Sequence, residues 1–227
     1  MTNSPLVTFT LLSPNSSNPR NKPITKITIH HMAGNLSVEQ CGELFAPPGR
    51  QASSNYGIGS DGRVAMYVEE KNRAWTSSSS ANDNQAVTIE VANNSGAPVW
   101  SVSDKALAAL IDLCTDICKR NGIAELVFDG TPNGSLTHHR MFASTSCPGP
   151  YLLSKFPHIA EEVNKRLEVK KMPEKRYNWI DEIPEWGKAT IEKLVLNNWL
   201  KGDGNGLNLS EDMIRLLVVL DRKGLFD

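Results

Sequence analysis

The sequence has almost no net charge and no long apolar run. Its 24 basic side chains are balanced by 25 acidic ones, which leaves a formal net charge of −1. Nucleic-acid-binding proteins normally carry a basic surplus, so we expect no nucleic-acid partner. No apolar run approaches the ~20 residues that a membrane-spanning helix needs, so we expect no membrane span. With 40% hydrophobic residues, the composition is that of a soluble globular protein.

The N-terminus lacks the features of a secretory signal. Residues 1–5 contain no basic side chain, and no long apolar core follows them. We therefore expect the protein to be made in the cytoplasm without a signal peptide.

Cysteine and histidine are scarce, with four and five copies in 227 residues. We expect three of the cysteines to be small core residues of a reduced protein: Cys41, Cys114 and Cys118. Cys147 differs because it lies in a polar loop segment, eight residues after His139. Four of the histidines form two adjacent pairs, His30–His31 and His138–His139.

The histidine pairs and Cys147 suggest a metal site. Two imidazoles and a thiolate, with a fourth position left open, are a ligand set that a catalytic zinc ion accepts. His30 and His31 close an alternating, β-branched run that predicts a strand. Because successive strand side chains point to opposite faces, we expect at most one of these two to reach a shared metal. The alternative is that the histidines are structural residues with satisfied hydrogen bonds.

Three further residues are candidates for catalysis. Glu90 is the one carboxylate of the β-rich segment Ala86–Ala92 and could serve as a general base, a role that contributes ~10²–10⁴-fold. Its alternative is a solvated strand carboxylate. A tetrahedral oxyanion needs a donor besides the metal, and Thr145 and Tyr56 are candidates. The alternative for Tyr56 is a core tyrosine.

Strands and long helices alternate along the first two-thirds of the chain. This order predicts an α/β unit with a central mixed sheet flanked by helices. Ser37 and Ser103 are expected to cap two of the helices. Leu6–Leu12 is expected to be an edge strand or an arm. The other expected strands are Ile24–His30, a hairpin around Asp61–Gly62, Ala86–Ala92 and Leu126–Phe128; the expected helices are 38–45, 104–120 and 151–167.

Several motifs together resemble those of a known family. They are the strand-end His30, Asn55-Tyr56 before Asp61-Gly62, Ala74-Trp75, Ile89-Glu90-Val91, and His139-Arg140 followed by Thr145-Ser146-Cys147-Pro148-Gly149. In this order, over residues 20–167, they resemble the type 2 N-acetylmuramoyl-L-alanine amidases. That family includes phage endolysins and peptidoglycan recognition proteins. The resemblance looks closest to endolysins of Gram-positive hosts.

The resemblance implies a zinc hydrolase that cuts the amide between N-acetylmuramic acid and L-alanine. It implies zinc ligands at His30, His139 and Cys147, and Glu90 as the base or water-orienting group. At the position of Thr145 several members carry lysine and others threonine. Many members carry a histidine where this chain has Thr76. The implied fold is that of the type 2 amidases and peptidoglycan recognition proteins.

The chain is expected to have two domains. We expect a zinc amidase domain over residues 1–169, a basic linker over 170–176 and a small helical module over 177–227. About 50 residues are close to the limit for independent folding, so the module is expected to form a homodimer, to pack on the first domain or to bind a cell-wall polymer. Its helices are expected to begin near Pro184 and Ser210.

The leading hypothesis is a phage endolysin that acts on the peptidoglycan of a Gram-positive host after release through membrane lesions. One alternative is a cytoplasmic amidase that recycles muropeptides. Another is a non-catalytic peptidoglycan-binding protein.

Overall fold

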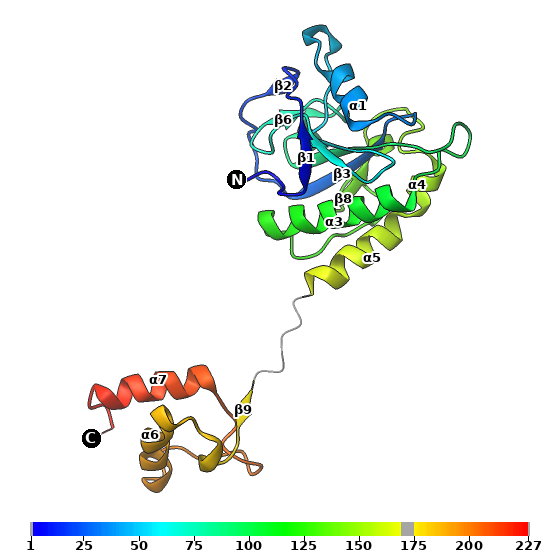
Figure 1. The fold of residues 1–227 in the computed structure, drawn as a ribbon. Helices are drawn as coiled ribbons and strands as arrows, with labels where there is room; N and C mark the ends of the chain where they lie inside the picture. The colour runs from blue at the N-terminus through cyan, green and yellow to red at the C-terminus, as the bar shows by residue number, and fades with distance from the viewer. Residues whose placement is uncertain (1, 169–174, 227) are drawn as a thin grey trace. The chain divides into compact units, whose positions relative to one another are not determined.

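The computed structural model describes residues 2–168 and 175–226. The chain divides into two compact units, residues 1–169 and 170–227 (Figure 1). Most of the expected linker, residues 170–174, lies outside the described residues. Along the described parts, no helix is long and apolar enough to cross a membrane.

The first unit is built on a six-stranded sheet with the order β1-β5-β4-β7-β3-β8. Strands β3, β7 and β8 run parallel, whereas β4 and β5 form an antiparallel hairpin. The expected mixed sheet flanked by helices is therefore confirmed. The strands are β1 (Val7–Thr10), β3 (Lys26–His31), β4 (Tyr56–Ile58), β5 (Val64–Met66), β7 (Ala86–Val91) and β8 (Leu136–His138); β2 (Ser16–Ser17) pairs separately with β6 (Arg73–Ala74).

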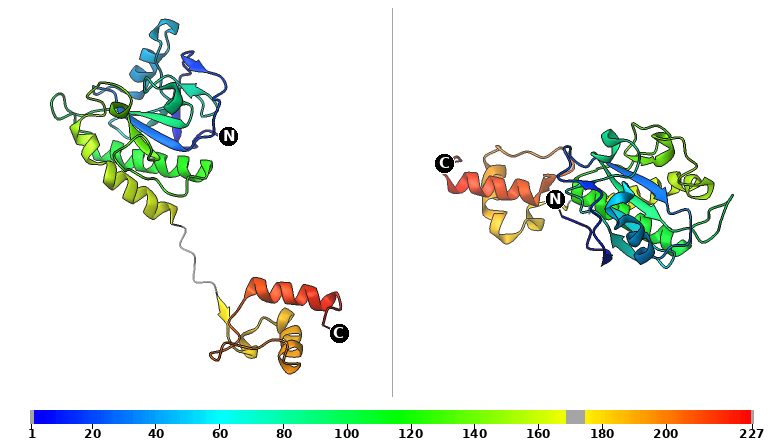
Figure 2. Two further views of the ribbon diagram at one scale, coloured as in Figure 1. Left: turned by 180° about the vertical axis from the view of Figure 1, so that it is seen from behind. Right: turned by 90° about the horizontal axis from the view of Figure 1, so that it is seen from above.

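Helices cover both faces of this sheet (Figures 1 and 2). On one face, α3 (Asp104–Asn121) and α5 (Phe156–Leu167) pack on the apolar side chains of β3, β4 and β7 and form the main core. On the other face, α1 (Val38–Phe45) packs on Ala65 and Tyr67 in a smaller cluster. The first unit also contains α2 (Ser80–Asp83), α4 (Pro150–Ser154) and the short 3-10 turns η1 (Pro48–Arg50) and η2 (His139–Met141).

The predicted helix caps are present. Ser37 and Gln40 form a reciprocal capping box at the start of α1. The Ser103 side chain accepts a hydrogen bond from the Ala106 N–H, and Gly122 ends α3 with a φ of 69°, in the left-handed region that glycine adopts without strain. Local hydrogen bonding therefore sets the ends of these helices, as expected from sequence.

Two expected elements differ from the structure. Residues 126–128 do not form a strand, because the Asn164 side chain of α5 satisfies both the N–H and the C=O of Leu126. The next strand after α3 is therefore β8, which begins at Leu136. The single helix expected over 151–167 is divided into α4 and α5. Pro157 lies in the first turn of α5, and a proline there cannot continue a preceding helix.

The second unit has its own small core. Its two main helices, α6 (Glu185–Leu196) and α7 (Glu211–Arg222), begin where the sequence predicted. Gly187 allows them to approach closely, because a Cβ at this position would collide with an Ile214 methyl group. The unit also contains η3 (Ile180–Glu182) and the strand pair β9 (Arg176–Tyr177) and β10 (Leu209–Ser210). The core residues are Tyr177, Ile183, Ile191, Leu194, Leu209, Ile214 and Val218.

Candidate metal centre and active site

A cavity of about 340 Å³ lies at the ends of β3 and β7, on the α1 face of the sheet. Its lining includes residues of β3, α1 and β7, together with the loop that follows β8. Ligand sites in sheets with parallel strands commonly lie beyond the carboxyl ends of the strands. The cavity volume is within the range of small-molecule sites, about 300–1,000 Å³.

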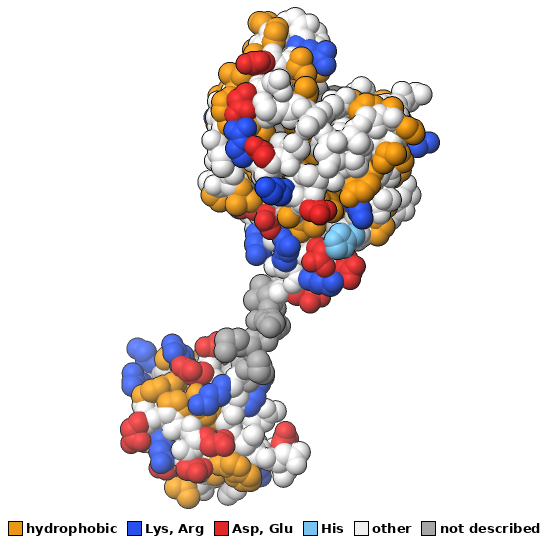
Figure 3. Space-filling view, turned by 45° about the vertical axis from the view of Figure 1, so that its right-hand side comes forward, with side chains coloured by type: hydrophobic (Ala, Val, Ile, Leu, Met, Phe, Trp, Pro, Cys, Tyr) orange, Lys and Arg blue, Asp and Glu red, His pale blue; other side chains and the backbone are white. Residues whose placement is uncertain are grey.

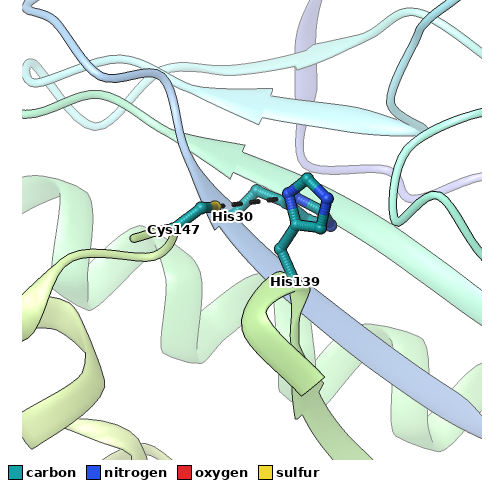
Figure 4. Close-up of side chains that lie close together, drawn as sticks. All are labelled: His30, His139 and Cys147. Carbon is teal, nitrogen blue, oxygen red and sulfur yellow. Dashed lines mark hydrogen bonds between the residues drawn. The ribbon is translucent and has the colours of Figure 1, made fainter. Parts of the chain in front are cut away.

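Two imidazoles and one thiol meet in this cavity (Figure 4). One candidate ligand atom each from His30, His139 and Cys147 lie within 4.8 Å of one another. The Cys147 Sγ lies 3.7 Å from His30 Nδ1, and the two imidazole centroids are 4.6 Å apart. Zinc bond lengths of about 2.3 Å to sulfur and about 2.0 Å to nitrogen place two tetrahedral ligands about 3.6 Å apart, so the sulfur–nitrogen distance fits a shared ion.

Strand register decides which histidine of each pair reaches the cavity. His30 pairs with Glu90 across β3 and β7, so both side chains lie on the α1 face. His138 pairs with Ile29, which lies on the opposite face, and its ring packs edge-on against Phe156. His139 follows after β8 ends, and its ring is free to turn towards His30.

The loop from His139 to Cys147 is held closed by its backbone. The Arg140 N–H donates to the Cys147 carbonyl at 3.2 Å, which brings the two predicted ligands of this loop together. The Cys147 sulfur also accepts the backbone N–H of His31 at 3.4 Å. An N–H donated to sulfur favours the thiolate, the form that binds metal.

The polar atoms of the cavity fit a metal ion. Among the described residues, the buried Nε2 of His139 and the buried Oε2 of Glu90 line the cavity and have no hydrogen-bond partner. Leaving such a group unpaired costs about 1–3 kcal/mol, so this cluster needs a ligand to satisfy it. Burial raises the pKa of the Cys147 thiol, and a bound divalent cation would reverse this effect by favouring the thiolate. Nitrogen and sulfur donors together are the preferred ligands of zinc.

Glu90 lies beside the cluster. Its Oε1 is 4.0 Å from His30 Nδ1. Its side chain is 14% exposed, so the carboxyl group is largely shielded from solvent but faces the cavity. Burial raises the pKa of Glu90 to about 8, and the nearby Arg50 opposes this shift. A carboxylate in this position can exchange a proton with a group bound in the cavity.

The structure places Thr145 at the cavity but not Tyr56. Thr145 lines the cavity, and its hydroxyl oxygen accepts the Cys147 N–H at 3.2 Å, which leaves its own O–H available. Tyr56 pairs with Ile89 and therefore points to the face that α3 and α5 cover, away from the cavity. Its hydroxyl donates to the buried Glu70 at 2.7 Å. The expectation that Tyr56 contributes to the oxyanion site is therefore corrected: Tyr56 is a core residue.

Sequence reasoning did not select several residues of the cavity wall. Arg50 is the only lysine or arginine among the described lining residues, and it comes from the short η1 turn. No periodicity or motif marks such a turn. Cys41 and Leu44 line the cavity from α1, and their spacing of three residues gives a helical signal that could have found them. Thr76 also lines the cavity and donates to the Ser53 carbonyl at 2.7 Å.

Comparisons with solved structures show the same fold. The catalytic domain of XlyA superposes with a TM-score of 0.55 at 13% identity, covering 68% of this chain and 97% of that one. An AmpD structure gives 0.54 at 16% identity, covering 70% and 99%. A mutant endolysin from Bacillus subtilis gives 0.53 at 15% identity, covering 68% and 97%. No match was found among curated protein sequences.

The sequence profile of one family matches the part of the chain that builds this cavity. The profile is described as N-acetylmuramoyl-L-alanine amidase, and it matches residues 20–150, more than half of the 227-residue chain. The matched segment contains His30, Glu90, His139 and Cys147. The chain therefore belongs to the N-acetylmuramoyl-L-alanine amidase family, an enzyme family whose substrate is peptidoglycan.

Proposed function

We propose that this chain is a zinc-dependent hydrolase that cleaves the amide between N-acetylmuramic acid and L-alanine, and that it acts as a phage endolysin on a Gram-positive cell wall. The proposal rests on the convergence of His30, His139 and Cys147 beside Glu90 in one cavity. Such a ligand set leaves one coordination position open, as in catalytic zinc sites. The family match and the fold shared with an endolysin support it.

Each residue has a role that suits its position. When bound by His30, His139 and Cys147, zinc would supply Lewis acidity to the amide carbonyl and to the attacking water. Glu90 takes up the proton of that water and passes it to the leaving amine of L-alanine. The Thr145 hydroxyl donates a hydrogen bond to the oxyanion of the tetrahedral intermediate.

The cleaved bond is the direct test. Purified Gram-positive peptidoglycan digested by the protein should release peptides with a free L-alanine amine and glycan chains with an intact lactyl group. Mass spectrometry of both fractions measures this. Cuts within the glycan or within the stem peptide would contradict the proposal. Faster hydrolysis of soluble muropeptides than of intact walls would favour the recycling alternative, and no cleavage of either would favour a binding protein.

The C-terminal unit, in this proposal, binds a polymer of the cell wall. A groove of about 420 Å³ is lined by Trp179, Asn178 and the glycines of the 202–206 loop. Trp179 is 60% exposed, Asn178 is the one polar side chain among the described residues of the groove, and Ile180, Val195 and Leu207 complete its lining. An exposed aromatic ring with one polar group beside it suits the apolar face of a saccharide ring. Self-association, the other role expected of this unit, would use a different surface, because no residue of α7 lines this groove.

Removing residues 170–227 should weaken binding to intact walls by ~10-fold or more, because a second point of attachment is lost. Hydrolysis of small muropeptides should change little, since the cavity is formed within the first unit. Co-sedimentation with purified walls measures the binding. Both chains should carry Glu90→Gln so that the walls stay intact. Equal sedimentation of the full and shortened chains would rule out the targeting role.

A further inference from the structure

An apolar face of α7 is exposed on the C-terminal unit. Met213, Leu216 and Val219 are 45%, 59% and 55% exposed, although Ile214 and Val218 of the same helix are buried in the core of the unit. Hydrophobic side chains are visible at the surface of this unit among charged ones in Figure 3. The core of the unit thus uses one side of α7 and leaves an apolar surface on the other.

Charges of opposite sign lie at the two ends of this face. An α-helix turns by about 100° per residue. Viewed along the axis of α7, Asp212 and Lys223 therefore both lie within about 40° of Leu216. Both side chains are exposed. The face, which we call the α7 stripe, therefore begins with an acidic residue and ends with a basic one. The stripe comprises Asp212, Met213, Leu216, Val219, Leu220 and Lys223.

We propose that a second copy of this chain docks on the α7 stripe, with the two helices antiparallel about a two-fold axis. If the axis passes between residues 217 and 218, Leu216 of one copy meets Val219 of the other. In the same register Asp212 of each copy meets Lys223 of the other, so the ion pair forms twice. A two-fold interface requires such a self-complementary surface.

The charges of the α7 stripe favour a second copy over a membrane, and the antiparallel over the parallel orientation of the two helices. A parallel pairing would place Asp212 against Asp212 and Lys223 against Lys223, which is repulsive. An anionic membrane is disfavoured because Glu211 and Asp212 begin the helix. Next to the stripe, the Arg215 guanidinium lies 5.7 Å from the Trp186 ring centre and forms an ion pair with Glu211. These side chains would form a polar rim around the apolar interface.

The dimer carries two catalytic units. If the substrate is peptidoglycan, as proposed above, the assembly attaches to one insoluble polymer at two points, which strengthens binding without any new contact to the wall. A single helix from each copy makes an interface smaller than the standard size, so we expect a dissociation constant in the micromolar range, roughly 10⁻⁶–10⁻⁴ M.

Sedimentation of the full chain over a range of concentrations tests the proposal. The wild-type protein should show a monomer–dimer equilibrium. Leu216→Lys should weaken it by ~10-fold or more, because the lysine would be buried without a partner. Asp212→Lys and Lys223→Asp should each weaken it by about 10-fold, since two ion pairs become repulsive. The double variant should restore dimerisation to near the wild-type level.

Leu12→Lys, a matched change at a 53%-exposed leucine of the first unit, should leave the equilibrium unchanged. A monomer at every concentration up to ~1 mM, roughly ten times the weakest expected constant, would overturn the proposal. So would a dimer that Leu216→Lys leaves intact, or single charge reversals that the double variant does not rescue. None of these readouts depends on hydrolysis, so they are separate from tests of the proposed function.

Discussion

Replacing Cys147 with serine should remove bound zinc and most of the amidase activity. The thiol lies within 4.8 Å of the nitrogen donors of His30 and His139, and no other cysteine belongs to this cluster among the described residues. A serine hydroxyl stays protonated near neutral pH and is a poor ligand compared with a thiolate. Changing a residue that only supports a metal ligand typically costs ~10–100-fold, so we expect a loss of at least ~100-fold when a ligand is changed.

Metal analysis after dialysis, together with hydrolysis of purified walls, measures this effect. Cys118→Ala is a suitable control, because Cys118 is a buried cysteine in the main core and lines no part of the cavity. The control should keep one zinc per chain even if its melting temperature falls. One zinc per chain in the Cys147→Ser protein would contradict the proposed ligand role.

Replacing Glu90 with glutamine should keep zinc bound but lower turnover by ~10²–10⁴-fold. The amide has almost the same shape as the carboxyl group, so the packing beside His30 is preserved. It cannot accept the proton that Glu90 is proposed to take from water. A pure loss of proton transfer lowers kcat while substrate binding persists.

Steady-state kinetics on a soluble muropeptide, with zinc content measured on the same sample, test this prediction. Glu39→Gln is the matched control, since Glu39 is an exposed carboxylate of α1 that pairs with Arg63 and is not part of the cavity wall. Wild-type turnover in the Glu90→Gln enzyme would exclude Glu90 from catalysis. Loss of zinc from this variant would instead assign Glu90 to metal binding.

Features set by neighbouring residues were predictable from the sequence. The capping box of Ser37 and Gln40, the glycine end of α3 and the starts of α6 and α7 all depend on contacts within a few residues. The strands β3 and β7 follow from their β-branched, alternating composition. The mixed sheet follows from the order of these elements along the chain.

Features set by strand register were not predictable in this way. Tyr56 and Gly57 are neighbours, yet only the pairing of β4 with β7 shows that Tyr56 shares the face of Ile89 rather than that of Glu90. A shift of one residue would have reversed this result. Leu126 has a strand-like sequence, but Asn164, which is 38 residues away, takes its backbone hydrogen bonds.

The sequence by itself determined which residue types were present for metal chemistry and which family their order resembles. It also determined most helices and strands, because capping and periodicity act over a few residues. The family resemblance implied that His30, His139 and Cys147 share one site, and the tertiary structure brings them together. Only the tertiary structure decided that His138 packs on Phe156 and that Tyr56 bonds to Glu70. The physical reason is that side-chain direction in a sheet depends on the register between strands, and that register is set by packing between residues far apart in the chain.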